Sequence, residues 1–69
     1  MDRFAKAVEN VLRRFEEKGF EEVDIYDVWI ETSIPMDLIE EVIRKNMVDI
    51  PSNIREVKLR GKNFWRRRN

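Results

Sequence analysis

The absence of cysteine and histidine from a chain of only 69 residues most strongly limits how this chain can fold. Disulfide bonds and zinc sites stabilise many small domains, and neither can be built from these residues in the usual way. A domain of this length buries only about 60% of the surface that its unfolded chain exposes, so it needs nearly every apolar side chain. We therefore expect one domain, residues 1–69, that is stabilised by packing, with or without association into oligomers.

A periodic apolar pattern predicts a first helix over residues 3–18. The apolar positions that share one face are Phe4, Val8, Val11, Leu12 and Phe15. Asp2 is placed to cap the start of this helix, and Gly19 provides the left-handed residue that ends it. Such an ending is expected to bring Phe20 back against Phe15.

The outer face of this first helix carries charges at helical spacing. Arg13 lies four residues after Glu9 and four residues before Glu17. Exposed ion pairs at this spacing stabilise a helix by only a few tenths of a kcal/mol each. The simplest interpretation of these charges is a face in contact with solvent.

Two further helices, separated by a tight turn, are predicted from a capping residue and a proline. Asp24 is placed to cap a helix over residues 24–32. Its inward positions are expected to be Ile25, Val28 and Trp29. Pro35 suits the first turn of a third helix, residues 35–46, and excludes the preceding residue from a helical conformation. The apolar stripe of the third helix is Met36, Ile39, Val42 and Ile43, with Leu38 beside it.

The remainder of the chain predicts a loop and then a β-hairpin over residues 54–68. Residues 47–53 contain several helix and strand breakers, and the apolar residues near them, Met47, Val48 and Ile50, are expected to fill gaps in the core. Alternating apolar and polar residues on either side of Gly61 predict the two strands. If Gly61 and Lys62 form a two-residue turn, Leu59 lies opposite Phe64.

Basic residues are concentrated at the C-terminal end. Residues 55–69 contain seven of the fourteen Lys and Arg residues and only one acid, Glu56. A formal net charge of zero therefore conceals a C-terminal segment of +6 and a remainder of −6. This asymmetry indicates a polyanionic partner. The alternative is that the charges only keep a small sheet with exposed edges soluble.

The order of the predicted elements resembles that of the winged helix-turn-helix domain. Three stretches carry the resemblance: residues 24–29 (DIYDVW), 32–35 (TSIP) and 57–65 (VKLRGKNFW). The resemblance covers residues 2–68 and implies an α+β fold of three helices followed by a C-terminal β-hairpin, the wing. In this family the helix after the turn usually enters the DNA major groove, and the wing contacts the phosphate backbone or the minor groove.

The resemblance implies a nucleic-acid-binding protein, with double-stranded DNA as the expected partner and transcription or replication as the expected setting. The candidate contact residues are Arg55, Lys58, Arg60, Lys62, Arg66, Arg67, Arg68, Arg44 and Lys45. The third helix also presents three acids, Asp37, Glu40 and Glu41, which would repel phosphates. We therefore expect the wing to lead binding. The alternative is an adaptor, or a subunit of a larger complex, that docks a protein partner through the acidic third helix.

The two tryptophans allow two interpretations each. Trp65, among the hairpin cations, could stack on a base, and Trp29 could contact a ligand. Large aromatic side chains more often pack over the core of a small domain. We favour packing for both.

Other functional classes find little support in the residues. The chain has no His or Cys, few hydroxyl groups and no glycine-rich phosphate loop, so neither an enzyme nor a cofactor is expected. Asp24, Asp27 and Glu31 recur at helical spacing, but helix capping accounts for the first two, and no metal site is expected. No apolar run approaches the roughly 20 residues that span a bilayer, and no signal peptide is evident, so a cytoplasmic protein without membrane contact is expected. A charged fraction of 41% without glutamine is typical of a thermophile.

Overall fold

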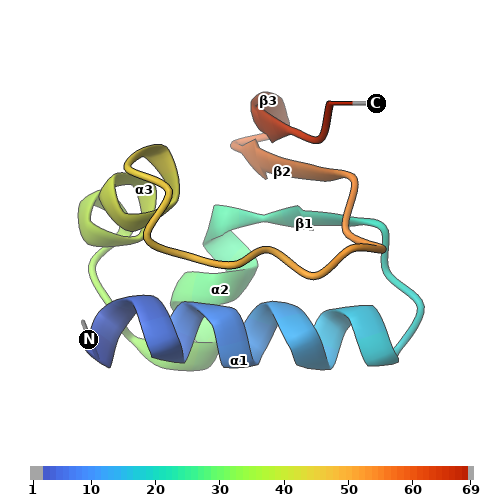
Figure 1. The fold of residues 1–69 in the computed structure, drawn as a ribbon. Coiled ribbons are helices and arrows are strands. Elements are labelled where there is room, and N and C mark those ends of the chain that lie inside the picture. Colours follow the sequence, from blue (N-terminus) through green and yellow to red (C-terminus); the bar gives the residue numbers. More distant parts are fainter. Residues whose placement is uncertain (1–2, 69) are drawn as a thin grey trace.

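The structure, a computed structural model, describes residues 3–68 (Figure 1). Its elements are α1 (Arg3–Glu17), β1 (Glu22–Asp24), α2 (Ile25–Thr32), α3 (Met36–Arg44), β2 (Glu56–Leu59) and β3 (Lys62–Arg66). The predicted α+β layout of three helices followed by a C-terminal hairpin is confirmed, with every boundary within two residues of its predicted position. The predicted cap Asp2 lies outside the described residues.

The three helices pack against one another, and α2 also contacts β1 and β2. In Figure 1, α1 lies along the bottom, the sheet lies across the top, and α2 lies between them. The largest fully buried side chains come from the helices, the loop before the sheet and β2: Leu12, Ile25, Ile39, Ile54, Val8, Val28, Val42 and Val57. A single apolar core therefore joins the helices to the sheet.

The end of α1 follows its prediction closely. Gly19 has a φ of 92°, which a residue with a side chain rarely adopts. The backbone N–H of Phe20 donates to the carbonyl of Phe15 at 3.1 Å, and that of Gly19 donates to Glu16 at 2.9 Å. The rings of Phe15 and Phe20 meet edge to face with their centroids 5.5 Å apart.

Three apolar residues that were expected to face the core do not do so. Phe4 is 38% exposed, Trp29 is 39% exposed and Met47 is 41% exposed. The buried residues of α2, Ile25 and Val28, lie on one face of the helix, and Trp29 lies outside that face. The prediction of an inward Trp29 is therefore wrong, and α2 presents an aromatic side chain to solvent.

The sheet has the order β1-β2-β3, with β1 parallel to β2 and β2 antiparallel to β3. The sequence also predicts a short extended segment, residues 21–23, before α2, but it does not predict that this segment pairs with the hairpin. A parallel pair cannot be joined by a tight turn, because the chain must return to the end where the first strand began. The segment between α3 and β2 makes this return across the molecule (Figure 1), which explains its length.

The hairpin turn differs from its predicted position. The turn residues are Arg60 and Gly61, with φ values of 55° and 80°, and Leu59 pairs with Lys62. Positive φ at both central positions matches the twist of the strands in a two-residue hairpin, so this turn is preferred although Arg60 carries a side chain. A register shift beside Val57 leaves Phe64 as an extra residue on β3.

Carboxylates of α1 hold the returning segment in place. The backbone N–H of Asp49 donates to Oε2 of Glu9 at 3.0 Å, and that of Asn53 donates to Oε2 of Glu16 at 2.9 Å. Glu9 is only 7% exposed, so its predicted place on a solvent-facing side is wrong. Its ion pair with Arg13 has an N to O distance of 3.9 Å. Glu9 is therefore primarily an acceptor for the loop.

Candidate nucleic-acid interface

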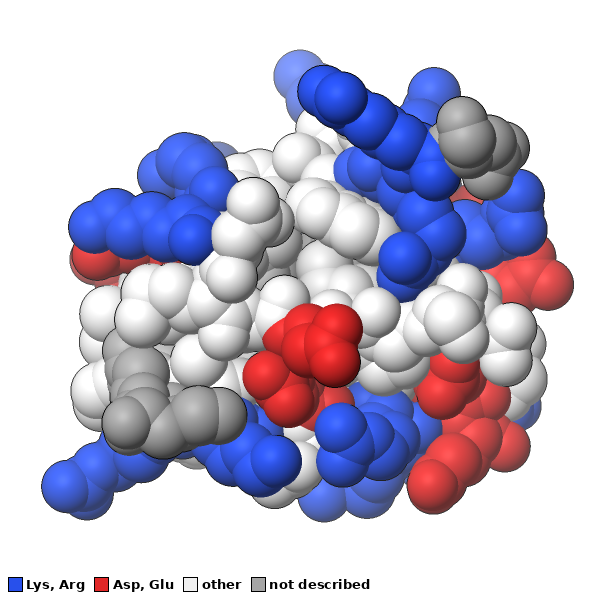
Figure 2. Space-filling view, viewed as in Figure 1, with Lys and Arg blue, Asp and Glu red and all other residues white. Residues whose placement is uncertain are grey.

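The candidate cations occupy the hairpin, its flanking residues and the last turn of α3. Figure 2 shows a group of Lys and Arg side chains at the upper right, over the C-terminal end of the chain. Acidic side chains lie between this group and a second basic group along the lower edge. The basic surface is therefore interrupted by acids, and the charge that each cation offers to a ligand depends on the acids beside it.

Four of the nine candidate cations form ion pairs. On the sheet, Lys58 lies 3.0 Å from Glu22 of β1, and Arg66 lies 3.9 Å from Glu56 of β2. On α3 the pairs are Arg44 with Glu40 at 3.7 Å and Lys45 with Glu41 at 3.1 Å. These contacts reduce the positive charge available to an external anion.

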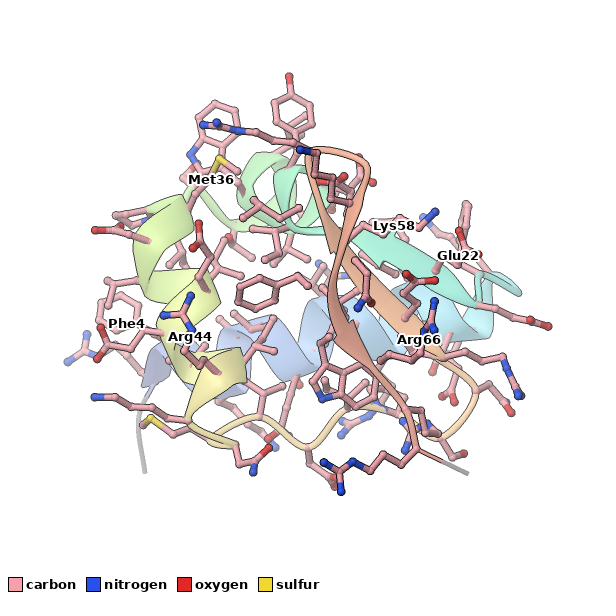
Figure 3. All side chains as sticks on the ribbon, turned by 90° about the horizontal axis from the view of Figure 1, so that it is seen from above. Phe4, Glu22, Met36, Arg44, Lys58 and Arg66 are labelled. Carbon is pink, nitrogen blue, oxygen red and sulfur yellow. The ribbon has the colours of Figure 1, made fainter. Side chains whose placement is uncertain are left out.

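Glu22 of β1 alters the pKa of one hairpin cation, Lys58. Its hydrogen bond and its charge raise the pKa of Lys58 above the ordinary value for lysine, and burial opposes them more weakly. Figure 3 shows the two side chains next to each other on the sheet. Asp24 of β1 lies opposite Lys58 of β2 in the parallel pairing, so the acidic part of the chain folds directly against the basic part.

The same neutralisation occurs at the open end of the hairpin. A hollow of about 360 Å³ there is lined entirely by charged residues: Glu21, Glu22, Glu56, Arg55, Arg66 and Arg67. Three acidic and three basic residues line this hollow, and among them Arg66 and Glu56 form an ion pair. The +6 segment of the sequence does not therefore become a uniformly positive surface in the folded protein.

The side chain of Arg67 is held by hydrogen bonds within the protein. Its Nη2 donates to the carbonyls of Pro51 at 2.8 Å and Ile50 at 3.1 Å, and its Nε donates to the carbonyl of Ile54 at 3.1 Å. Its guanidinium carbon lies 5.1 Å from the centroid of the Trp65 ring. Arg67 therefore fastens the returning loop to the end of the hairpin, a role that was not predicted.

Four candidate cations remain exposed and form no ion pair with residues 3–68: Arg55, Arg60, Lys62 and Arg68. Arg60 and Lys62 flank Gly61 at the turn. Arg55 and Arg68 lie at the open end, where the backbone N–H of Arg67 donates to the carbonyl of Arg55 at 2.9 Å. The unpaired positive charge thus lies at both ends of the hairpin.

Asp24 positions the turn that carries two of these cations. Its Oδ1 accepts from the N–H of Tyr26 at 2.8 Å, which is the predicted helix cap. Its Oδ2 accepts from the N–H of Gly61 at 3.0 Å, across 37 residues of sequence. One carboxylate therefore joins the start of α2 to the hairpin turn, and only the first contact could be read from the sequence.

Trp65 is half-buried and packs against the core, as we favoured. We expect Trp65→Ala to lower the free energy of unfolding by about 2 kcal/mol, less than for a fully buried tryptophan, because part of the ring is exposed. Chemical denaturation followed by circular dichroism would measure the loss. Trp29→Ala is the comparison and should cost less, because Trp29 is the more exposed of the two tryptophans, at 39%. Unchanged stability of Trp65→Ala with loss of DNA binding would instead make Trp65 a stacking residue.

Comparisons with known proteins find no matching family model, curated protein or solved structure. Within residues 3–68, no group of three or more His, Cys, Asp or Glu residues is placed to hold a metal ion. No helix among the described residues combines the length and the apolar character required to cross a membrane.

Proposed function

We propose that this protein binds double-stranded DNA through the cations of the β2–β3 hairpin, as a winged helix-turn-helix protein acting in transcription or replication. The observation that carries the proposal is the set of four exposed hairpin cations without an ion-pair partner among the described residues. Phosphate contacts from Arg and Lys dominate the affinity of most DNA-binding proteins. The hairpin is also the element on which the resemblance to the winged-helix family placed the backbone contacts.

The exposed face of α3 supports a binding mode led by the hairpin. Arg44 and Lys45 are each paired with an acid one turn earlier in the helix, and Asp37 adds a further negative charge. Insertion of this helix into the major groove would bring three carboxylates toward phosphates. Because phosphate contacts alone carry little sequence information, we propose modest sequence specificity.

The proposal predicts that the affinity for DNA falls as the salt concentration rises, with a moderate slope. Four phosphate contacts correspond to a slope of about −3.6 for log affinity against log salt concentration on duplex DNA. Replacing Arg60 and Lys62 together by alanine should reduce the slope by nearly two units, and the melting temperature should change little because both side chains are exposed. Fluorescence anisotropy with a labelled duplex at several salt concentrations measures this slope.

Two lysines outside the hairpin, Lys6 of α1 and Lys18 just after it, provide the control for net charge. Lys6 and Lys18 are exposed and form no ion pair with the described residues. Their joint replacement by alanine removes the same charge away from the hairpin and should leave the slope almost unchanged. A wild-type slope near zero, or equal effects of the two double variants, would contradict binding through the hairpin.

The second candidate function is a protein-binding adaptor. Its docking surface is better supported at α2 than at the acidic third helix. Two of the three acids of α3 are paired within that helix, which leaves little free negative charge for a basic partner. The exposed apolar residues lie instead on α2, with Tyr26 50% exposed and Ile30 54% exposed. A protein partner would therefore be expected at α2.

A further inference from the structure

A groove of about 670 Å³ lies between α2, the start of α3 and the hairpin turn. Its lining residues are Tyr26, Trp29, Met36, Asp24, Asp27, Arg60 and Gly61. Figure 3 shows Met36 at the start of α3, on the side of the molecule that carries the hairpin turn. The volume is within the range of about 300–1,000 Å³ that is common for binding sites.

The floor of this groove is aromatic and exposed. The rings of Tyr26 and Trp29 lie 5.5 Å apart at an angle of 41°, with exposed fractions of 50% and 39%. A domain of this size needs its large apolar side chains in the core, so leaving two aromatic residues side by side in solvent has a cost in stability. Contiguous exposed apolar surface is characteristic of interaction sites.

The charges around the groove indicate which ligand it would accept. Asp27 is exposed and forms no ion pair with any residue in the described range 3–68, and α2 itself contains no Lys or Arg. Both carboxylate oxygens of Asp24 already accept backbone N–H groups. Arg60 provides the single positive charge, on the wall formed by the hairpin turn.

A cationic side chain gains two favourable contacts in this setting. An ammonium or guanidinium group is attracted to the faces of Trp and Tyr rings, and it would also pair with the free carboxylate of Asp27. A nucleic-acid strand could stack a base on the same rings, but its phosphates would meet Asp27. Charge complementarity thus favours a basic protein segment over a polyanion.

We propose that this groove binds a segment of a partner protein that carries Lys or Arg beside an apolar anchor residue. The apolar residue would contact Trp29 and Met36, and the cation would lie over the rings of Tyr26 and Trp29, against Asp27. Of the four cations proposed above to contact DNA, Arg60 lines this groove, whereas Lys62, Arg55 and Arg68 do not, so the two sites share one residue.

Selection from a phage-displayed library of random peptides on the immobilised full-length protein tests this proposal. We expect enrichment of peptides that combine Lys or Arg with an apolar residue. The affinity of a selected peptide, measured by isothermal titration calorimetry, should fall by about tenfold or more in Trp29→Ala and in Asp27→Asn. Asp27→Asn keeps the size of the side chain and removes only its charge.

Lys62→Ala is the matched control, because it removes a hairpin cation outside the groove and should leave peptide affinity unchanged. The proposal would be overturned if no peptides were enriched, or if the enriched peptides were acidic. It would also be overturned if Trp29→Ala and Asp27→Asn bound a selected peptide as tightly as the wild type does. A single-tryptophan variant, Trp65→Phe, tests the competing ligand. Quenching of Trp29 fluorescence by oligothymidylate, without peptide enrichment, would show a base-stacking site instead.

Discussion

Replacing Arg67 by alanine is expected to lower the free energy of unfolding by about 3 kcal/mol, although the residue lies near the C-terminus in a run of three arginines. The guanidinium donates to three carbonyls, those of Ile50, Pro51 and Ile54. A hydrogen bond to a charged group contributes up to about 3 kcal/mol of stability. The variant also loses the contact with the Trp65 ring. For so small a domain the melting temperature should fall by more than about 10 °C, as measured by circular dichroism.

Two substitutions serve as controls for this result. Arg68→Ala removes the neighbouring, exposed arginine and should change the unfolding free energy by less than about 0.5 kcal/mol. Arg67→Lys keeps the charge but loses the planar fork of donors, so it should remain clearly destabilised. If Arg67→Ala melted like the wild type while the salt dependence of DNA binding became shallower by about one unit, Arg67 would be a phosphate ligand, as first predicted.

Replacing Ile54 by alanine should cost even more, about 3–4 kcal/mol of unfolding free energy. Ile54 is fully buried although it lies outside every helix and strand. It packs in the core cluster that also contains Val57 and Leu12, so its truncation leaves a cavity there. Urea unfolding, fitted for both midpoint and slope, would measure the loss and show whether the transition remains two-state.

Met47→Ala is the control within the same segment. Met47 is 41% exposed, so the substitution should cost less than about 1 kcal/mol. An equally small effect of Ile54→Ala would mean that the returning segment is not part of the core.

Local patterns determined the helices and their ends. Gly19 and Asp24 act as predicted because a positive φ and an N-terminal cap involve only residues close in sequence. The stripe of Ile39, Val42 and Ile43 on α3 is buried as predicted, because helical periodicity alone places these residues on one face. The α+β layout follows from the order of such local signals.

Contacts between segments that are far apart in the sequence could be identified only from the tertiary structure. The turn at Arg60 and Gly61, the parallel pairing of β1 with β2 and the burial of Glu9 each depend on partners many residues away. A shift of one residue in the turn alters every pair along the hairpin, and the sequence contained two acceptable positions for it. The exposure of Trp29 likewise depends on which side of α2 its neighbours cover.

The charge distribution shows most clearly what the sequence determined and what the tertiary structure determined. The sequence by itself determined that half of the cations lie in the last fifteen residues, with only one acid, and that the chain as a whole is neutral. Only the tertiary structure decided which cations are free, because β1 brings Glu22 against Lys58 and the returning loop engages Arg67. Electrostatic attraction depends on distance in space, and a parallel pairing across 34 residues of sequence brought the acidic and basic parts of the chain together.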